Sequence, residues 1–167
     1  DRSITGTVRV ENKELGTIDY IRDMTNAGGK TKRRLAKEGS GPPVLVRIAS
    51  QVEGGKLICQ IGSGEPELAL AAALHVHQGD VGGFDINMGC PKKFSVSGGM
   101  GSALLSDPDR ACRIIRTLRD NLPLKPISAK IRLLPSGKAK KNGVAPPDIP
   151  KTLDFINALI ERGGANA

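Results

Sequence analysis

Residues 57–87 read LICQIGSGEPELALAAALHVHQGDVGGFDIN, and this stretch decides the fold class. A short apolar run opens it, a stretch rich in alanine and leucine follows, and a second apolar run closes it. Pro66 suits the first turn of a helix and Gly79 suits its end, so we expect a helix between two strands. A strand–helix–strand order predicts parallel strands that are covered by helices.

The same alternation continues toward the C-terminus. We expect strands near residues 57–62, 81–86 and 126–132, and helices near residues 65–78, 107–121 and 151–162. Doubly wound sheets and (β/α)8 barrels both have this order, but a complete barrel needs eight units in roughly 250 residues. We therefore predict an α/β fold that is a partial (β/α)8 TIM barrel of about three consecutive β/α units.

The first part of the chain lacks this pattern. Residues 1–43 mix short alternating runs with the basic, Gly- and Pro-rich stretch GGKTKRRLAKEGSGPP at 28–43. We expect two parts, an irregular N-terminal segment with a basic loop over residues 1–43 and a partial TIM-barrel catalytic domain over residues 44–167. A second basic loop, SGKAKKNGVAPPDIP, is expected at 136–150.

The composition limits the class of protein. The net charge of +8 suits a polyanionic partner such as a nucleic acid, although a generically basic protein has the same charge. The three cysteines are odd in number and far apart, which argues against a disulfide framework and against a zinc site, so no metal is expected.

Targeting signals are also missing from the sequence. No apolar run is long enough to cross a membrane, and the first residue, Asp1, does not begin a signal peptide. We expect an intracellular protein of the cytoplasm, the nucleus or both, without a membrane partner. Because the chain does not begin with Met, we expect that it was processed or excised from something longer.

Polar side chains occur near the ends of the three predicted strands. Gln60, Asn87 and Lys130 each have an ordinary explanation alone, such as a loop hydrogen bond, a strand cap or a lysine that reaches water. The carboxyl ends of parallel strands, however, meet at one edge of the sheet, and ligands bind there. The three residues together therefore predict a functional site at this edge.

Cys90 lies just beyond the second strand, between Gly89 and Pro91. A cysteine held there can be a nucleophile if its pKa is lowered, or a proton donor if it stays a thiol. The two histidines, His75 and His77, lie on a predicted covering helix and are expected to be structural. The composition therefore favours a thiol acid.

Three further features have competing interpretations. Cys59 and Cys112 lie within a strand and a helix and are expected to be packing residues. The GGMG turn at 98–101 resembles a phosphate-binding turn, but it lacks the spacing of known motifs, so we expect a turn that must pass close to Cys90. Four arginines recur every third residue on one predicted helix, where they would meet RNA phosphates or merely be solvated: Arg110, Arg113, Arg116 and Arg119.

The stretch DINMGCPKKFSVSGGMGSALLSDPD at 85–109 resembles the signature of the tRNA-dihydrouridine synthases, which are flavoproteins built on a (β/α)8 barrel. The flanking LICQIGS and PISAKIRLLPS resemble the neighbouring barrel strands of that family. The form of the central motif is most similar to the eukaryotic branch that reduces uridine 20 in the D loop of tRNA. The resemblance covers residues 44–167 clearly and residues 1–23 more loosely.

The resemblance implies a chemistry for each site residue. NADPH would reduce FMN, the flavin hydride would go to C6 of a uracil in tRNA, and Cys90 would protonate C5. Gln60 and Lys130 match positions that bind FMN, and Asn87 matches a position that contacts the uracil. The tRNA is the implied partner, and no obligate protein partner is inferred.

The sequence also departs from the family pattern. The PM motif of the first barrel strand is missing, and the His-Gly-Arg stretch and the flavin-phosphate loops would follow Ala167. We therefore expect this chain alone to be incomplete as an enzyme. Two alternatives stay open, a dihydroorotate-dehydrogenase-like flavoprotein and a truncated, inactive chain that binds RNA weakly.

Overall fold

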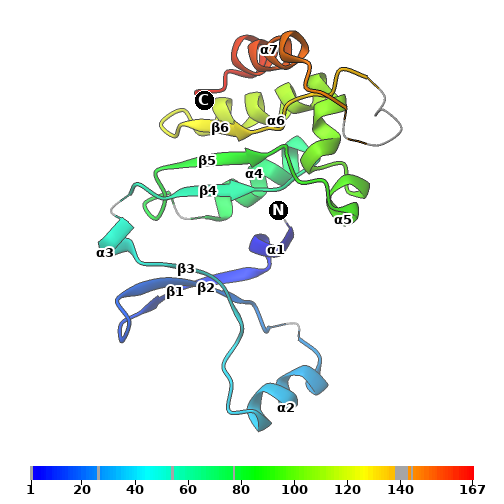
Figure 1. Ribbon diagram of the computed structural model, residues 1–167. Helices are drawn as coiled ribbons and strands as arrows, with labels where there is room; N and C mark the ends of the chain where they lie inside the picture. The colour runs from blue at the N-terminus through cyan, green and yellow to red at the C-terminus, as the bar shows by residue number, and fades with distance from the viewer. Residues whose placement is uncertain (1, 26, 54, 77, 138–142, 144) are drawn as a thin grey trace.

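The computed structural model describes residues 2–25, 27–53, 55–76, 78–137, 143 and 145–167, and it contains two three-stranded β-sheets (Figure 1). The first sheet is antiparallel and the second is parallel. The elements in chain order are α1 Arg2–Thr5, β1 Thr7–Asn12, β2 Thr17–Arg22, α2 Gly29–Lys37, β3 Val44–Ile48, α3 Ser50–Glu53, β4 Ile58–Ile61, α4 Pro66–His75, β5 Gly83–Asn87, α5 Lys93–Ser97, the 3-10 helix η1 Gly101–Ser106, α6 Pro108–Asn121, β6 Ile127–Lys130, α7 Ile149–Ala158 and the π-helical turn η2 Leu159–Gly163.

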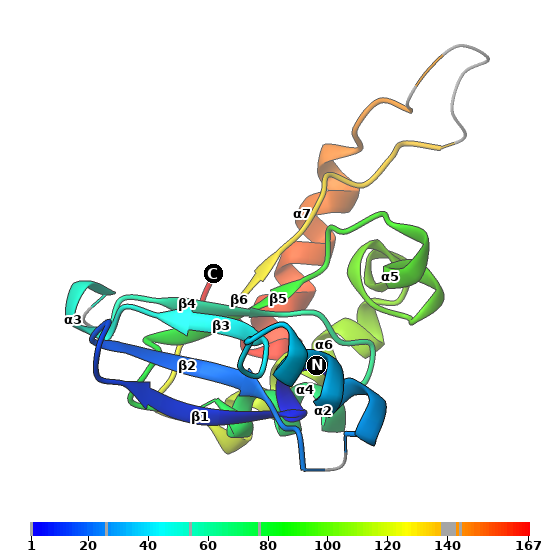
Figure 2. The ribbon, with the colours of Figure 1, turned by 90° about the horizontal axis from the view of Figure 1, so that it is seen from below.

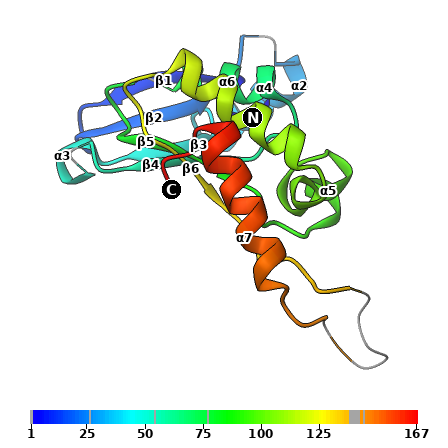
Figure 3. The same ribbon diagram turned by 90° about the horizontal axis from the view of Figure 1, so that it is seen from above.

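The parallel sheet has the strand order β4-β5-β6, so the prediction of three adjacent parallel strands is confirmed. Helices α4, α6 and α7 follow the three strands, as expected. Among the described residues, this sheet is three strands wide and does not close on itself. The free edge of β6 meets the end of the chain, where Asn166 N–H donates to the Ile127 carbonyl at 2.8 Å and Ala129 N–H donates to the Ala167 carbonyl at 3.0 Å (Figure 3).

One face of the parallel sheet is apolar and is covered by helices. Phe84, Ile86 and Ile127 point to this face and are at most 1 % exposed. Helix α4 packs small alanines into the same core, and α6 adds the apolar positions that the sequence pattern indicated: Ala111, Ile114, Ile115 and Leu118. Burial of this stripe stabilises α6 on the sheet, and the Asp107 side chain caps the helix by accepting from Arg110 N–H at 3.0 Å.

The N-terminal part of the chain differs from the prediction. We predicted irregular structure for residues 1–43, but β1 and β2 form an antiparallel hairpin there. The hairpin turn is held by Asn12, whose side-chain oxygen accepts from Leu15 N–H at 3.1 Å, and by Gly16 at a φ of 63°. Strand β3 then pairs with β2 and not with β4, so this sheet extends past residue 43 to Ile48.

The connections around β3 also differ from the prediction. The expected basic loop contains helix α2, because lysine, arginine, leucine and alanine are good helix formers. Gly39 ends this helix in the left-handed conformation, at a φ of 62°. A short helix, α3, lies in the connection between β3 and β4. Of the second basic loop, residues 138–142 and 144 lie outside the described residues.

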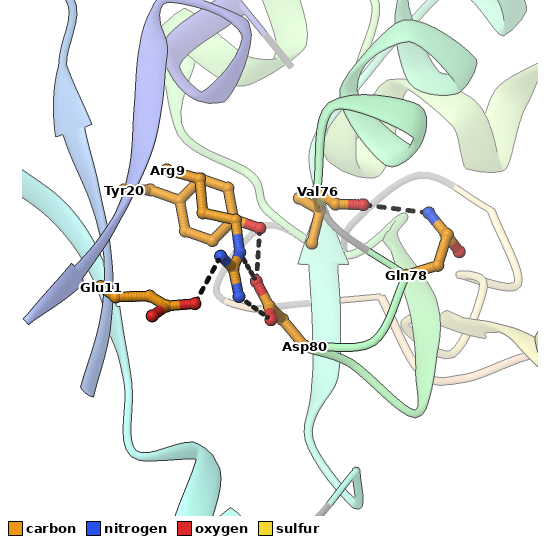
Figure 4. A network of polar contacts seen from close by, with 6 residues as sticks. All are labelled: Arg9, Glu11, Tyr20, Val76, Gln78 and Asp80. Atoms are coloured by element: carbon orange, nitrogen blue, oxygen red, sulfur yellow. Dashed lines mark hydrogen bonds and ion pairs between the residues drawn. The ribbon is translucent and has the colours of Figure 1, made fainter. Parts of the chain in front are cut away.

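An ion pair between the buried Asp80 and the half-buried Arg9 joins the two sheets (Figure 4). The Asp80 carboxylate, on the loop before β5, accepts hydrogen bonds from Arg9 Nε at 2.8 Å, from Arg9 Nη2 at 2.9 Å and from the Tyr20 hydroxyl at 2.8 Å. Asp80 is 7 % exposed and Tyr20 is 1 % exposed. The carboxylate raises the pKa of Arg9. A carboxylate can be buried at low cost only when it is paired in this way, so these residues fix how the N-terminal sheet attaches.

His75 belongs to the same junction. Its Nε2 lies 3.1 Å from the Thr7 hydroxyl, and its ring centroid lies 6.4 Å from that of Tyr20. These contacts support the expected structural role of His75, whereas His77 lies outside the described residues. No helix among the described residues is both long enough and apolar enough to cross a membrane.

The junction yields a stability prediction. Asp80→Ala should lower the free energy of unfolding by about 3 kcal/mol, because it removes the buried carboxylate that accepts from both Arg9 and the Tyr20 hydroxyl. Glu11→Gln is the matched control, because Glu11 also pairs with Arg9, at 3.6 Å, but its side chain is 66 % exposed. Chemical denaturation should show a loss below about 1 kcal/mol for the control. Equal losses in the two variants would contradict the assigned role of the junction.

Candidate active site

A row of polar side chains crosses the uncovered face of the parallel sheet. Gln60, Asp85 and Ser128 are neighbours in register on β4, β5 and β6. The Asp85 carboxylate accepts from Gln60 Nε2 at 2.7 Å and from the Ser128 hydroxyl at 2.8 Å. Parallel strands are normally apolar on both faces, because both faces are buried. A carboxylate-centred row on the middle strand is not needed for packing, so it marks this face as a candidate site.

Asn87 connects this row to the loop that carries Cys90. Its Nδ2 donates to Gln60 Oε1 at 3.0 Å. Its Oδ1 accepts from the backbone N–H of Gly89 at 3.1 Å and from that of Cys90 at 3.0 Å. The amide of Asn87 therefore fixes the position of the Cys90 backbone relative to the polar row.

Glycines allow the GGMG turn to pass beside Cys90. Gly101 has a φ of +62°, and a Cβ atom at this position would lie 2.5 Å from the Cys90 carbonyl oxygen. The next residue, Ser102, donates its N–H to the same carbonyl at 2.9 Å. Gly64 allows a second close approach, since its Cβ would lie 2.7 Å from the carbonyl oxygens of Gly98 and Gly99. The prediction that this turn needs glycine to approach Cys90 is confirmed.

The surroundings of Cys90 make its thiol more acidic. A hydrogen bond with the backbone of Lys92 is the main cause of a lowered pKa of Cys90, and partial burial opposes it. The Ser95 side chain and the positive charges of Lys92 and Arg132 lower the pKa further. Arg132 is held near the loop because its Nε donates to the Gly89 carbonyl.

The other two cysteines lie away from this edge. Cys59 is half-buried in β4, and Cys112 is buried in α6, where its thiol donates to the Ala158 carbonyl at 3.3 Å. Burial raises the pKa of both thiols. Both therefore behave as packing residues.

Lys130 completes the set of residues expected at the site. It ends β6 and is the register partner of Asn87, and its backbone carbonyl accepts from Met88 N–H at 2.9 Å. Its side chain is exposed. The structure thus brings Gln60, Asn87, Cys90 and Lys130 to the carboxyl ends of β4, β5 and β6.

Three residues of this site were not predicted from the sequence. Asp85 and Ser128 lie inside strands, and Arg132 follows β6. Strand alternation contains the missing signal, because Asp85 is two residues before Asn87 and therefore shares its face.

The arginine stripe of α6 is largely occupied within the chain. Arg110 pairs with Asp107 at 3.0 Å, Arg116 donates to the Arg162 carbonyl at 2.8 Å and 3.1 Å, and Arg119 donates to the Lys125 carbonyl at 3.1 Å. These contacts favour a structural role over RNA binding.

Comparison with known proteins gives consistent matches. The family model described as Dihydrouridine synthase (Dus) matches residues 41–145. The chain is 46% identical over 138 residues to the tRNA-dihydrouridine(20) synthase (NAD(P)+) of Saccharomyces cerevisiae, covering 80% of this chain and 33% of that protein. It is 40% identical over 133 residues to the protein of the same name from Schizosaccharomyces pombe, covering 78% of this chain and 24% of that protein.

A bacterial relative is more distant. The tRNA-dihydrouridine(16) synthase of Vibrio vulnificus is 30% identical over 136 residues, which cover 80% of this chain and 36% of that protein. The chain thus spans between 24% and 36% of the length of these three curated relatives.

The acidity of Cys90 predicts an order of thiol reactivity. With iodoacetamide, Cys90 should react with a pH midpoint below the value of about 8.5 for free cysteine, and before Cys59 and Cys112. Arg132→Gln should move this midpoint upward, because it removes a positive charge that favours the thiolate. Mass spectrometry of peptides labelled across a pH series measures each thiol separately. A Cys90 midpoint above that of free cysteine would contradict the described environment.

Proposed function

Because the chain belongs to the dihydrouridine synthase family, we propose that it carries the proton-donating part of a tRNA-dihydrouridine synthase active site. The proposed reaction reduces the C5–C6 double bond of a uridine in the D loop of tRNA to 5,6-dihydrouridine. The observation that carries the proposal is the polar row of Gln60, Asp85 and Ser128, to which Asn87 ties the Cys90 loop.

The uncovered face has groups that suit a flavin. Gln60 offers an amide and Lys130 an ammonium group, and both side chains are exposed on this face. We propose that these two residues hold the ring of FMN. When bound, FMN would supply the hydride, which it takes from NADPH. The Lys130 charge would stabilise negative charge on the reduced ring, and the names of two relatives, which include NAD(P)+, support the nicotinamide donor.

Cys90 would complete the reduction. The hydride adds to C6 of the uracil, the Cys90 thiol gives its proton to C5, and the two additions together saturate the double bond. The thiolate left behind is stabilised by the groups that lower the pKa of Cys90, namely the Lys92 backbone and the charge of Arg132. The second hydrogen on Asn87 Nδ2 would be available to orient the uracil.

The parallel part of the chain would be a segment of a (β/α)8 barrel. The strand order β4-β5-β6 with its following helices supports this proposal. The backbone hydrogen bonds of Asn166 and Ala167 to β6 also support the proposal. They place these two residues along the edge of β6 where the next strand of a barrel would pair. The division into an N-terminal segment and a barrel domain remains part of the proposal. A tRNA substrate would place the enzyme in the cytoplasm, the nucleus or both.

The family match argues against the dihydroorotate-dehydrogenase alternative. The internal partners of three arginines on α6 weaken the alternative of a chain that only binds RNA through that helix.

The acid role is tested by Cys90→Ala in a full-length family member that carries this segment. Flavin reduction by NADPH should be unchanged, while dihydrouridine formation should slow by about 10²–10⁴-fold, because a positioned general acid is lost. Cys59→Ala is the matched control and should react at the parent rate. Single-turnover measurements separate the two half-reactions, and a Cys90→Ala enzyme that modifies tRNA at the parent rate would refute the assignment.

A further inference from the structure

We propose that helix α2 is an RNA-binding element whose cationic face contacts the phosphate backbone of the tRNA substrate; the identity of that polyanion rests on the proposed function. The helix lies in residues 23–43, which connect the adjacent antiparallel strands β2 and β3. A two-residue turn would suffice for such a connection. The base of this excursion is closed by Arg22 N–H, which donates to the Pro43 carbonyl at 2.9 Å.

Four of the five cations of α2 lie on one face of the helix, and the fifth, Lys32, donates to the Thr25 carbonyl at 3.2 Å. Lys30, Arg33, Arg34 and Lys37 occupy positions i, i+3, i+4 and i+7, and all four are exposed. With a rise of 1.5 Å per residue, the four charges extend over about 10 Å. Arg34 pairs with Glu38 at 3.7 Å, and no ion pair or side-chain hydrogen bond is recorded for the other three among the described residues.

The contacts of the described residues do not explain this clustering of charge. No residue of α2 is fully buried where its burial is described, so packing gives the helix little stability. The pairs Lys30–Arg34 and Arg33–Lys37 place like charges four residues apart, which destabilises a helix. A polyanion would reduce this repulsion, because its phosphates neutralise the cations of α2. The release of condensed counterions from the phosphates further favours binding.

The chemistry of α2 favours RNA over a membrane surface. Leu35 is the one large apolar side chain in the sequence of the helix, GKTKRRLAK. Helices that lie on membranes need an apolar face of residues such as Trp, Phe and Leu. Figure 1 shows α2 projecting from the N-terminal sheet away from the parallel sheet, and in Figures 1 and 2 it lies on the right of the N-terminal sheet, as does α5, the helix after Cys90.

The test measures binding of unmodified tRNA by this chain and by two charge-matched variants. One carries Lys30→Gln, Arg33→Gln and Lys37→Gln, and glutamine retains a good helix propensity. The control carries Lys13→Gln, Lys56→Gln and Arg113→Gln, three exposed cations outside α2. Circular dichroism and thermal unfolding establish that both variants are folded.

The α2 variant should bind tRNA about tenfold or more weakly near 0.1 M salt, and its slope of log K against log salt should be shallower by about two to three. The control should lose much less. Equal weakening of the two variants, or no measurable binding of tRNA by the parent, would overturn the proposal. Loss of binding to phosphatidylserine vesicles in place of tRNA would also overturn it. A failure of the proposed reaction would instead appear in the Cys90→Ala kinetics, which do not depend on α2.

Discussion

The Asp85 carboxylate sets the direction of the hydrogen bonds in the candidate site. An ionised carboxylate only accepts hydrogen bonds, so Gln60 must turn its Nε2 toward Asp85 and its Oε1 toward Asn87. Asn87 must then donate to Gln60, which leaves its Oδ1 to accept from the backbone N–H groups of Gly89 and Cys90. The orientation of each amide follows from the one before it. The position of the cysteine loop therefore depends on Asp85, a charged residue two positions before Asn87 on the same strand.

One face of the parallel sheet packs against helices and contributes stability, and the opposite face carries the candidate site. Phe84 and Ile86 alternate with Asp85 and Asn87 along β5, so neighbouring residues of one strand serve opposite faces. The apolar set packs under α4 and α6 and holds the strands in register. That register aligns the polar set, because a shift of one residue would exchange the two faces. Packing on the apolar face therefore determines the geometry of the site on the opposite face.

The features that could be predicted from the sequence depend on interactions between residues close in the chain, and those that could not depend on partners far away in it. The parallel strands and their helices were predictable, because apolar periodicity and signals such as Pro66 act locally. The N-terminal hairpin was not, because its strands carry Arg9 and Asp19, whose partners Asp80 and Arg47 are distant in the sequence. A charged residue in a short run predicts a solvent-exposed loop unless its partner is known. Asp85 was missed for the same reason, although the edge position of Asn87 was readable.

Strand β5 separates the attachment of the N-terminal sheet from the candidate site. Asp80 lies just before this strand and Cys90 just after it, so the ion pair and the thiol lie at opposite ends of β5. In α/β folds, residues at the amino ends of the strands serve stability, and the carboxyl ends carry chemistry. The pair with Arg9 holds the N-terminal sheet through specific, directional contacts. Helix α2 lies in the chain between β2 and β3, which belong to that sheet. The sheet therefore positions the cations of α2, and it attaches at the end of β5 opposite to Cys90.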